Sequence, residues 1–308
     1  MTLGAPARLA LAALLLGGTP PAPLRVHVPG RAPVAWWWSD RAGADADARL
    51  AGAAFWRADA PGLETAELVL DAPGEGGIAA LGRVRLVLAR VDPARHALRL
   101  VAGAPPGSPW DVDDAPAAAR LAVNAGQFTD DGPWGWVVRD GRELPALAPG
   151  PLSAALVVGT DGAVRIADAA ELAVARAEAA RALVREAVQS YPALLAGDGE
   201  VPAPLRAADR GVDLAHRDAR LAVGTLRDGR VLVILTRFDA LGPGAPARVP
   251  LGLTVPEMAA VAGGLGARRA VLLDGGLSAQ LLVRDAGGAT RRWPGTRHVP
   301  LGLVAVPR

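Results

Sequence analysis

The hydrophobic residues of this 308-residue chain fall mainly in short apolar runs bounded by turn residues, a pattern that is typical of β-strands. Between residues 84 and 100, two such runs flank Asp92-Pro93, which predicts two strands joined by a turn. A hairpin is predicted in the same way around Asp228-Gly229. Further predicted strands cover residues 120–124, 136–139, 154–158, 221–226, 231–235, 270–273 and 299–306. Sheet therefore dominates the predicted fold.

Two segments predict helices instead. Residues 169–189 are rich in Ala, Leu, Glu and Arg and have few helix breakers. The second helix begins at Thr254, which forms a capping box with Glu257, and it ends near Gly266. Strands and helices together predict one α+β domain over residues 55–308, with a mixed, largely antiparallel sheet and a few flanking helices.

The N-terminal region is predicted to lie outside that domain. Residues 1–23 have the layout of a secretory signal peptide, with Arg8 before an apolar run from Leu9 to Leu16 and small residues and prolines after it. The run is too short to anchor the protein across a bilayer. Residues 24–54 are expected to form a less regular extension. We therefore expect export to the periplasm or the extracellular space, with no stable membrane anchor after the signal is removed.

Composition narrows the classes of partner and metal. The chain has 33 Lys and Arg against 31 Asp and Glu, a net charge of +2, which disfavours a nucleic-acid partner. It has no cysteine, so disulfides, lipid attachment at cysteine and thiolate metal sites are excluded. Its four histidines are scattered singly, so no zinc site is expected. No cofactor is specified by a motif, although carboxylate and carbonyl oxygens would suit Ca²⁺ or Mg²⁺.

The segment from Ala270 to Val283 places one carboxylate between two apolar runs. Asp274 ends the first run, and Gly275-Gly276 permit a sharp bend that leaves room for a ligand near Ser278. Asp-Gly between apolar strands is equally a common hairpin signal. Taken alone, the segment fits either a catalytic loop or a plain hairpin.

Three other polar features are candidates for chemistry. Asn124 ends a predicted strand, where its amide could bind a sugar hydroxyl or a phosphate oxygen, or cap its own turn. Trp134-Gly135-Trp136 could form a stacking wall for a sugar ring or belong to the core. Further along, strand alternation places Asp218 and Arg220 on one face and Arg217 on the other. One of these arginines could bind phosphate with its planar fork, or the cluster could form surface ion pairs.

The order of these motifs resembles that of a known family. In sequence come V-N-A-G-Q-F, P-W-G-W-V-V-R-D-G, Q-S-Y-P-A-L-L-A-G-D-G, R-D-A-R-L-A-V-G-T-L-R-D-G-R, G-L-T-V-P-E-M and L-L-D-G-G-L-S-A-Q-L. Their order and spacing resemble the phosphodiester glycosidase family, which includes an enzyme that removes N-acetylglucosamine from a mannose phosphodiester and many exported bacterial proteins. The resemblance extends from about Phe55 to the C-terminus.

The resemblance implies a set of site residues. Its implied catalytic residues are Asp274, Arg220 and Asn124, and its implied substrate-binding residues are Gly135, Gly275, Gly276, Ser278 and Arg217. The chain departs from the family pattern at Leu277, where a third Gly is frequent, and at Gln127, where an aromatic residue or Gly is common. These departures bear on the floor of the pocket and on the substrate more than on the fold.

The resemblance also implies a function. We expect an exported hydrolase that cleaves the sugar–phosphate bond of glycosyl-1-phosphodiesters in cell-envelope or extracellular polysaccharide. A phosphate leaving group needs little general-acid help, so Arg220 would stabilise its charge while Asp274 either attacks the anomeric carbon or activates water. The alternative is a non-catalytic glycan-binding or envelope-assembly protein that uses the same cleft. The presence of both side chains favours the enzyme, because a carboxylate only repels a bound phosphate.

Overall fold

The computed structural model describes most of the expected domain and parts of the N-terminal extension. The described residues are 24–27, 34–36, 48–71, 83–105, 107–145, 152–197, 199–202, 205, 213, 216–239 and 251–308. The predicted signal peptide lies outside this part of the chain. Within it, no helix is both long and apolar enough to cross a membrane.

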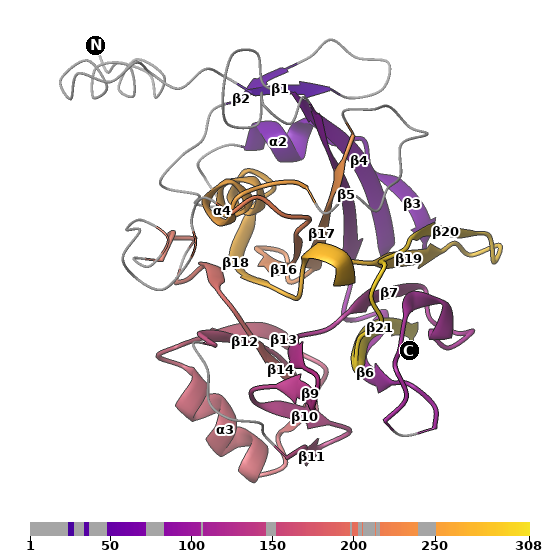
Figure 1. Ribbon diagram of the computed structural model, residues 1–308, viewed down its shortest axis with the longest axis vertical. Helices are drawn as coiled ribbons and strands as arrows, with labels where there is room; N and C mark the ends of the chain where they lie inside the picture. Colours follow the sequence, from indigo (N-terminus) through magenta and orange to yellow (C-terminus); the bar gives the residue numbers. More distant parts are fainter. Residues whose placement is uncertain are drawn as a thin grey trace.

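The described chain is predominantly β, and its strands pair antiparallel (Figure 1). The largest sheet has nine strands, in the order β15-β18-β16-β17-β5-β4-β1-β2, with β3 paired to β4. Its strands are β1 (Leu24–His27), β2 (Val34–Trp36), β3 (Arg57–Ala60), β4 (Leu63–Asp71), β5 (Arg83–Val91), β15 (Ala193–Leu195), β16 (Leu221–Leu226), β17 (Val231–Phe238) and β18 (Ala267–Leu272).

Two five-stranded sheets and one short hairpin complete the β-structure. The second sheet, β11-β10-β14-β12-β13, comprises β10 (Val137–Arg139), β11 (Arg142–Glu143), β12 (Ala154–Gly159), β13 (Val164–Asp168) and β14 (Val184–Ser190). The third sheet, β20-β19-β7-β21-β6, comprises β6 (His96–Ala102), β7 (Leu121–Asn124), β19 (Leu281–Arg284), β20 (Thr290–Trp293) and β21 (Leu301–Pro307). The hairpin pairs β8 (Gln127–Thr129) with β9 (Gly132–Trp134).

In the described part of the chain, the helices are short and lie against the sheets. They are α2 (Ala48–Ala53), α3 (Leu172–Ala180), α4 (Val255–Gly264) and the 3₁₀ turns η2 (Val112–Asp114) and η4 (Gly276–Ser278). In Figure 1, α2 and α4 cover one side of the nine-stranded sheet, and α3 lies on the second sheet. The capping box of Thr254 and Glu257 is present at the start of α4, as the sequence predicts.

The central strands of the nine-stranded sheet are buried on both faces, which explains their unbroken apolar runs. On β17, Leu232 and Ile234 pack in the core under α4, whereas Val233 and Leu235 pack in the core shared with the second and third sheets. Neighbouring strands divide their residues in the same way. Burial of both faces anchors the strand ends, and the candidate site is built at those ends.

The structure corrects the predicted helix at residues 169–189. Helix α3 ends at Ala180, Ala182 has a positive φ of 57°, and residues 184–190 form strand β14. That strand pairs with both β10 and β12, so its backbone groups and its apolar side chains are satisfied by the sheet. Tertiary pairing therefore outweighs the helical propensity of the second half of this segment.

Other predicted strands are present, but some of them are connected differently from what was expected. The predicted hairpin at Asp228-Gly229 is the antiparallel pair β16 and β17. The strands around Asp92-Pro93 are present, but β5 and β6 belong to different sheets. Residues 24–54 contain β1, β2 and α2, and β1 pairs with β4, so the extension is more regular than expected. The fold is α+β in content, but β-structure prevails.

Candidate active site

The turn that carries Asp274 connects two sheets. It follows β18 of the nine-stranded sheet and leads through η4 into β19 of the third sheet, and β18 and β19 do not pair with each other. The backbone N–H of Asp274 donates to Gly126 O at 3.2 Å, and that of Gly276 donates to Ala219 O at 2.8 Å. The plain-hairpin interpretation of this segment is therefore wrong, and the turn joins three segments that are distant in the sequence.

Glycine is required at two positions of this turn. A Cβ atom on Gly275 would lie 2.5 Å from the carbonyl oxygen of Ala219. Gly276 has a φ of +57°, and a Cβ there would lie 2.9 Å from Oδ2 of Asp218. The absence of side chains lets the turn approach the segment that carries Asp218 and Arg220.

A cavity of about 270 Å³ opens where these segments meet. Its polar lining includes Gln127, Tyr191, His216, Asp218, Arg220 and Asp274, and Gly275 also lines it. We call it the Asp274 cavity. Of the predicted site residues, it brings together Asp274, Arg220 and Gly275.

The environment of Asp274 makes its carboxylate easy to protonate. Burial raises the pKa of Asp274 to about 6, and the negative charge of Asp218 acts in the same direction. A hydrogen bond from the Ser278 hydroxyl, the positive charge of Arg297 and the Gly275 N–H act in the opposite direction. A carboxyl group with a pKa near 6 is ionised at neutral pH and is suited to accept a proton or to attack as a nucleophile.

Asn124 contacts the backbone of Asp274 and is fully buried. Its Nδ2 donates to the backbone carbonyl of Asp274 at 2.7 Å, and its Oδ1 accepts from the backbone N–H of Gln280 at 3.0 Å. Both ends of the amide are thus used to fix the two sides of the Asp274 turn. Ser278 is also buried, and its hydroxyl bonds to the Asp274 carboxylate. These two predicted residues support Asp274 rather than line the cavity.

The two arginines of the H-R-D-A-R segment have different environments. Arg220 lines the cavity, where its Nε donates to Leu253 O at 2.9 Å and its Nη2 to His216 O at 2.7 Å. Arg217 instead forms a two-point ion pair with Glu257 at the start of α4, with distances of 2.7 and 2.8 Å. Asp218 and Arg220 thus face the same cavity and Arg217 does not, as the predicted alternation has it.

Gly135 is not among the residues that line the Asp274 cavity. It has a φ of +89°, and a Cβ there would lie 2.2 Å from Cδ1 of Leu152. The residue after it, Trp136, is fully buried, and its backbone N–H donates to Oε1 of Gln189 at 2.9 Å. Gly135 therefore shapes the packing of the second sheet, and Trp136 is a core residue rather than a stacking wall.

The cavity also contains polar residues that were not predicted as site residues. Burial raises the pKa of Asp218, whose Oδ1 accepts from the Ala219 N–H at 2.8 Å and whose Oδ2 lies 3.6 Å from Nε2 of His216. Tyr191 and Gln127 line the cavity as well. Asp218 could have been predicted as a cavity residue from the sequence, because it lies two residues before Arg220 and alternation in an extended segment places both on one face. Among the described residues, no group of three or more His, Cys, Asp or Glu is arranged to bind a metal ion.

Comparison with known proteins assigns the family. Residues 117–306, more than half of the chain, match the family model of the phosphodiester glycosidases. The chain belongs to this family. No curated protein matches it in sequence.

Solved structures show the same fold at low sequence identity. The catalytic domain of zebrafish N-acetylglucosamine-1-phosphodiester alpha-N-acetylglucosaminidase, auto-inhibited by its pro-peptide, is 17% identical with a TM-score of 0.61, over 83% of this chain and 88% of that one. A Burkholderia pseudomallei protein described as exported is 15% identical with a TM-score of 0.50, over 82% of this chain and 96% of that one. Both solved structures are therefore similar to this chain in fold.

Proposed function

We propose that the protein is an exported hydrolase that cleaves the bond between a sugar and a phosphate in glycosyl-1-phosphodiesters of cell-envelope or extracellular polysaccharide. The observation that carries the proposal is that Asp274 and Arg220 line one cavity in a member of the phosphodiester glycosidase family. Export is supported by the signal-like residues 1–23. It is also supported by the similar protein of Burkholderia pseudomallei described as exported.

The proposed reaction replaces one bond to the anomeric carbon. The bond from that carbon to the phosphate oxygen breaks, and its electron pair leaves with the phosphate monoester. Water supplies the new oxygen, and its proton is taken up by a carboxylate. Asp274 either accepts this proton directly or first forms a covalent bond to the sugar that water then hydrolyses. Both routes need Asp274 ionised, so activity should rise as the pH increases through about 6.

Arg220 would stabilise the departing phosphate. Its Nε and Nη2 are held by the backbone carbonyls of Leu253 and His216, so the guanidinium is oriented before substrate binds. Fixed donors that face developing negative charge contribute more to catalysis than mobile ones. Asp218 lies on the same wall and would face the sugar or the attacking water, because a carboxylate next to phosphate would be repelled.

The experiment is hydrolysis of aryl and alkyl glycosyl phosphodiesters in water enriched in oxygen-18. A glycosidase places the label in the released sugar, whereas a phosphodiesterase that cleaves at phosphorus places it in the phosphate. We expect the label in the sugar only. Label in the phosphate would overturn the proposal. Binding of the diester without any turnover over the pH range 5 to 8 would instead establish the non-catalytic glycan-binding alternative.

A further inference from the structure

A cavity of about 430 Å³ lies at the end of strand β7 that is far from Asp274. Its lining residues lie at the β3–β4, β5–β6 and β19–β20 turns, just before β7 and at the end of β21. Arg120 lines it and immediately precedes β7, whereas Asn124, at the other end of β7, bonds to the backbone of Asp274. At about 3.3 Å per residue, roughly 13 Å of chain separates Arg120 from Asn124. We call this cavity the His96 pocket.

The polar side chains that line the His96 pocket are all basic. No Asp or Glu of the described part of the chain is among its lining residues. The remaining lining residues are small and apolar. The basic residues are Arg95, His96, Arg120 and Arg308, and the apolar ones are Ala60, Pro61, Ala94, Ala286 and Pro307.

The positive charge of this lining is only partly compensated. Nη1 of Arg120 donates to the backbone carbonyl of Asp285 at 2.6 Å, a contact that orients the guanidinium without neutralising it. Nε of Arg95 lies 3.8 Å from Oδ2 of Asp92, which is beyond hydrogen-bonding distance. Arg308 is the last residue, and its own main-chain carboxylate offsets its guanidinium. The excess positive charge therefore comes from Arg95 and Arg120.

His96 supplies a second, independent observation. Its side chain is only 2% exposed, and its buried Nδ1 has no hydrogen-bond partner within the described part of the chain. Burial lowers the pKa of His96, and the charges of Arg120 and Arg95 act in the same direction, whereas the charge and backbone of Asp92 oppose them. A buried polar atom without a partner costs free energy. An oxyanion in the pocket would supply the missing acceptor and offset the repulsion from the arginines.

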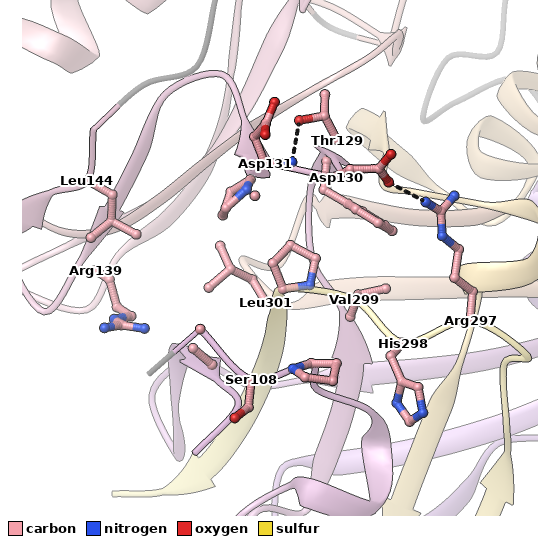
Figure 2. Close-up of a pocket in the computed structure, with 17 residues that line it drawn as sticks. Ser108, Thr129, Asp130, Asp131, Arg139, Leu144, Arg297, His298, Val299 and Leu301 are labelled. Carbon is pink, nitrogen blue, oxygen red and sulfur yellow. Dashed lines mark hydrogen bonds and ion pairs between the residues drawn. The ribbon is translucent and has the colours of Figure 1, made fainter. Parts of the chain in front are cut away.

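Arginines line two other cavities of the molecule, but carboxylates accompany them there. In the cavity beside the β8–β9 hairpin, Asp130 and Asp131 belong to the lining, and Asp130 lies 3.6 Å from Arg297 (Figure 2). In a cavity beside β4 and β5, Glu67 pairs with Arg85 at 2.7 Å. The lining of the His96 pocket is therefore the better match to an anion.

We propose that the His96 pocket binds the phosphate group of a small phosphate monoester. Guanidinium groups only donate hydrogen bonds, and the oxygens of a phosphate dianion accept them. The small apolar residues of the lining pack against the organic group of the ester. The site is separate from the Asp274 cavity, and the proposal holds whether or not the protein hydrolyses a phosphodiester.

The first test follows the ring C–H signals of two histidines by NMR while methyl phosphate is added. His216 lines the Asp274 cavity and reports on that site, whereas His96 reports on its own pocket. The variants His96→Gln and His216→Gln assign the two signals. We expect a saturable shift of the His96 signal that persists in Arg220→Gln, in which phosphate binding at the Asp274 cavity is weakened. A shift of the His216 signal alone, or no shift of either signal, would overturn the proposal.

The second test measures affinity by titration calorimetry, with Arg220→Gln as the parent protein. We expect Arg120→Gln to weaken binding of methyl phosphate by about tenfold or more, the effect of one charge-assisted hydrogen bond. Arg95→Gln should also weaken binding, and its exposed side chain makes it unlikely to disturb folding. The control Arg142→Gln removes an equal charge at an exposed position of β11 and should bind as the parent does.

The same measurement tests the class of ligand. Dimethyl phosphate and acetate carry a single negative charge, so we expect both to bind about tenfold more weakly than methyl phosphate. Equal affinity for methyl phosphate and acetate would overturn the assignment to a phosphate monoester. Unchanged affinity for methyl phosphate in both Arg120→Gln and Arg95→Gln would overturn the assignment to the His96 pocket.

Discussion

Two of the Asp-Gly turns in this chain, Asp228-Gly229 and Asp274-Gly275, follow apolar strands in the same way but do different things. The first closes the hairpin of β16 and β17. Its carboxylate is half exposed and is paired with Arg230 at 2.7 Å. The second joins two sheets, and its carboxylate faces a cavity.

The pKa values of the two aspartates move in opposite directions. Partial burial raises the pKa of Asp228, but the hydrogen bonds and charge of Arg230 outweigh it and leave that pKa lowered. Burial raises the pKa of Asp274 to about 6, and its partners do not compensate. A carboxylate that its own fold leaves incompletely paired is available to a substrate, whereas one fully paired by a neighbour stabilises a turn.

The largest expected contrast is in activity. We predict that Asp274→Asn lowers kcat on a glycosyl phosphodiester by roughly 10⁴-fold or more, as removal of a catalytic side chain does in other enzymes. The amide keeps the shape and can still accept from Ser278, so the fold should persist. Asp228→Asn is the matched control and should retain wild-type kcat. Steady-state kinetics measures both, and wild-type turnover by Asp274→Asn would remove the carboxylate from the chemistry.

The next contrast concerns Arg220, which lines the same cavity as Asp274, and Arg230, which pairs with Asp228. We predict that Arg220→Lys lowers kcat/KM on phosphodiesters by about 10²- to 10³-fold, because lysine keeps the charge but loses the oriented fork. Arg230→Lys, in the surface turn, should have little effect. Activity on aryl glycosides with neutral leaving groups, if they are cleaved, should fall much less in Arg220→Lys. Equal losses on both substrate types would show that Arg220 holds the sugar or the architecture, and phosphate stabilisation would pass to Arg297.

The sequence predicted much of this site because its information is local or ordered along the chain. Strand ends, the Gly-Gly pair and the alternation of Asp218 and Arg220 all follow from short-range pattern. The order of the family motifs supplied the long-range link between Arg220 and Asp274. The sequence could not show which of the two Asp-Gly turns closes a hairpin. The two turns have the same local pattern and differ only in whether the strand after the turn pairs with the strand before it.

The parts that were mispredicted depend on tertiary contacts. Residues 184–190 have helix-forming composition, yet two neighbouring strands make them β14. The packing of Gly135 was likewise hidden from the sequence, because its tight contact is with Leu152, which precedes β12 in the chain. A cavity next to the β8–β9 hairpin combines residues 107–109, 128–133 and 297–301, which no periodicity connects. Such sites appear only when the chain is folded.

The opposite pKa shifts predict opposite effects of pH on stability. The pKa of Asp274 is raised, so its contribution to stability is fully present below about 4 and is lost as the pH rises through about 6. Relative to wild type, Asp274→Asn should therefore gain stability between pH 4 and pH 8, by roughly 3 kcal/mol at most. The pKa of Asp228 is lowered, so its contribution is present at neutral pH and is lost in acid. Urea unfolding across this range should show Asp228→Asn less stable than wild type at pH 8, by a smaller amount. The same sign for both variants would contradict the contrast.

The smallest contrast compares the glycines of the two turns. Gly229 and Gly276 both have positive φ, +81° and +57°, so replacing either with Ala should cost about 1 to 2 kcal/mol of unfolding free energy. A Cβ on Gly229 meets nothing within 4 Å, whereas one on Gly276 would lie 2.9 Å from the Asp218 carboxylate and must displace it. We therefore predict similar losses of stability for Gly229→Ala and Gly276→Ala, but a fall in kcat/KM on the order of tenfold for Gly276→Ala alone. Unfolding curves and kinetics on the same preparations separate the two effects. If both variants lose activity in proportion to stability, Asp218 has no part in the chemistry of the Asp274 cavity.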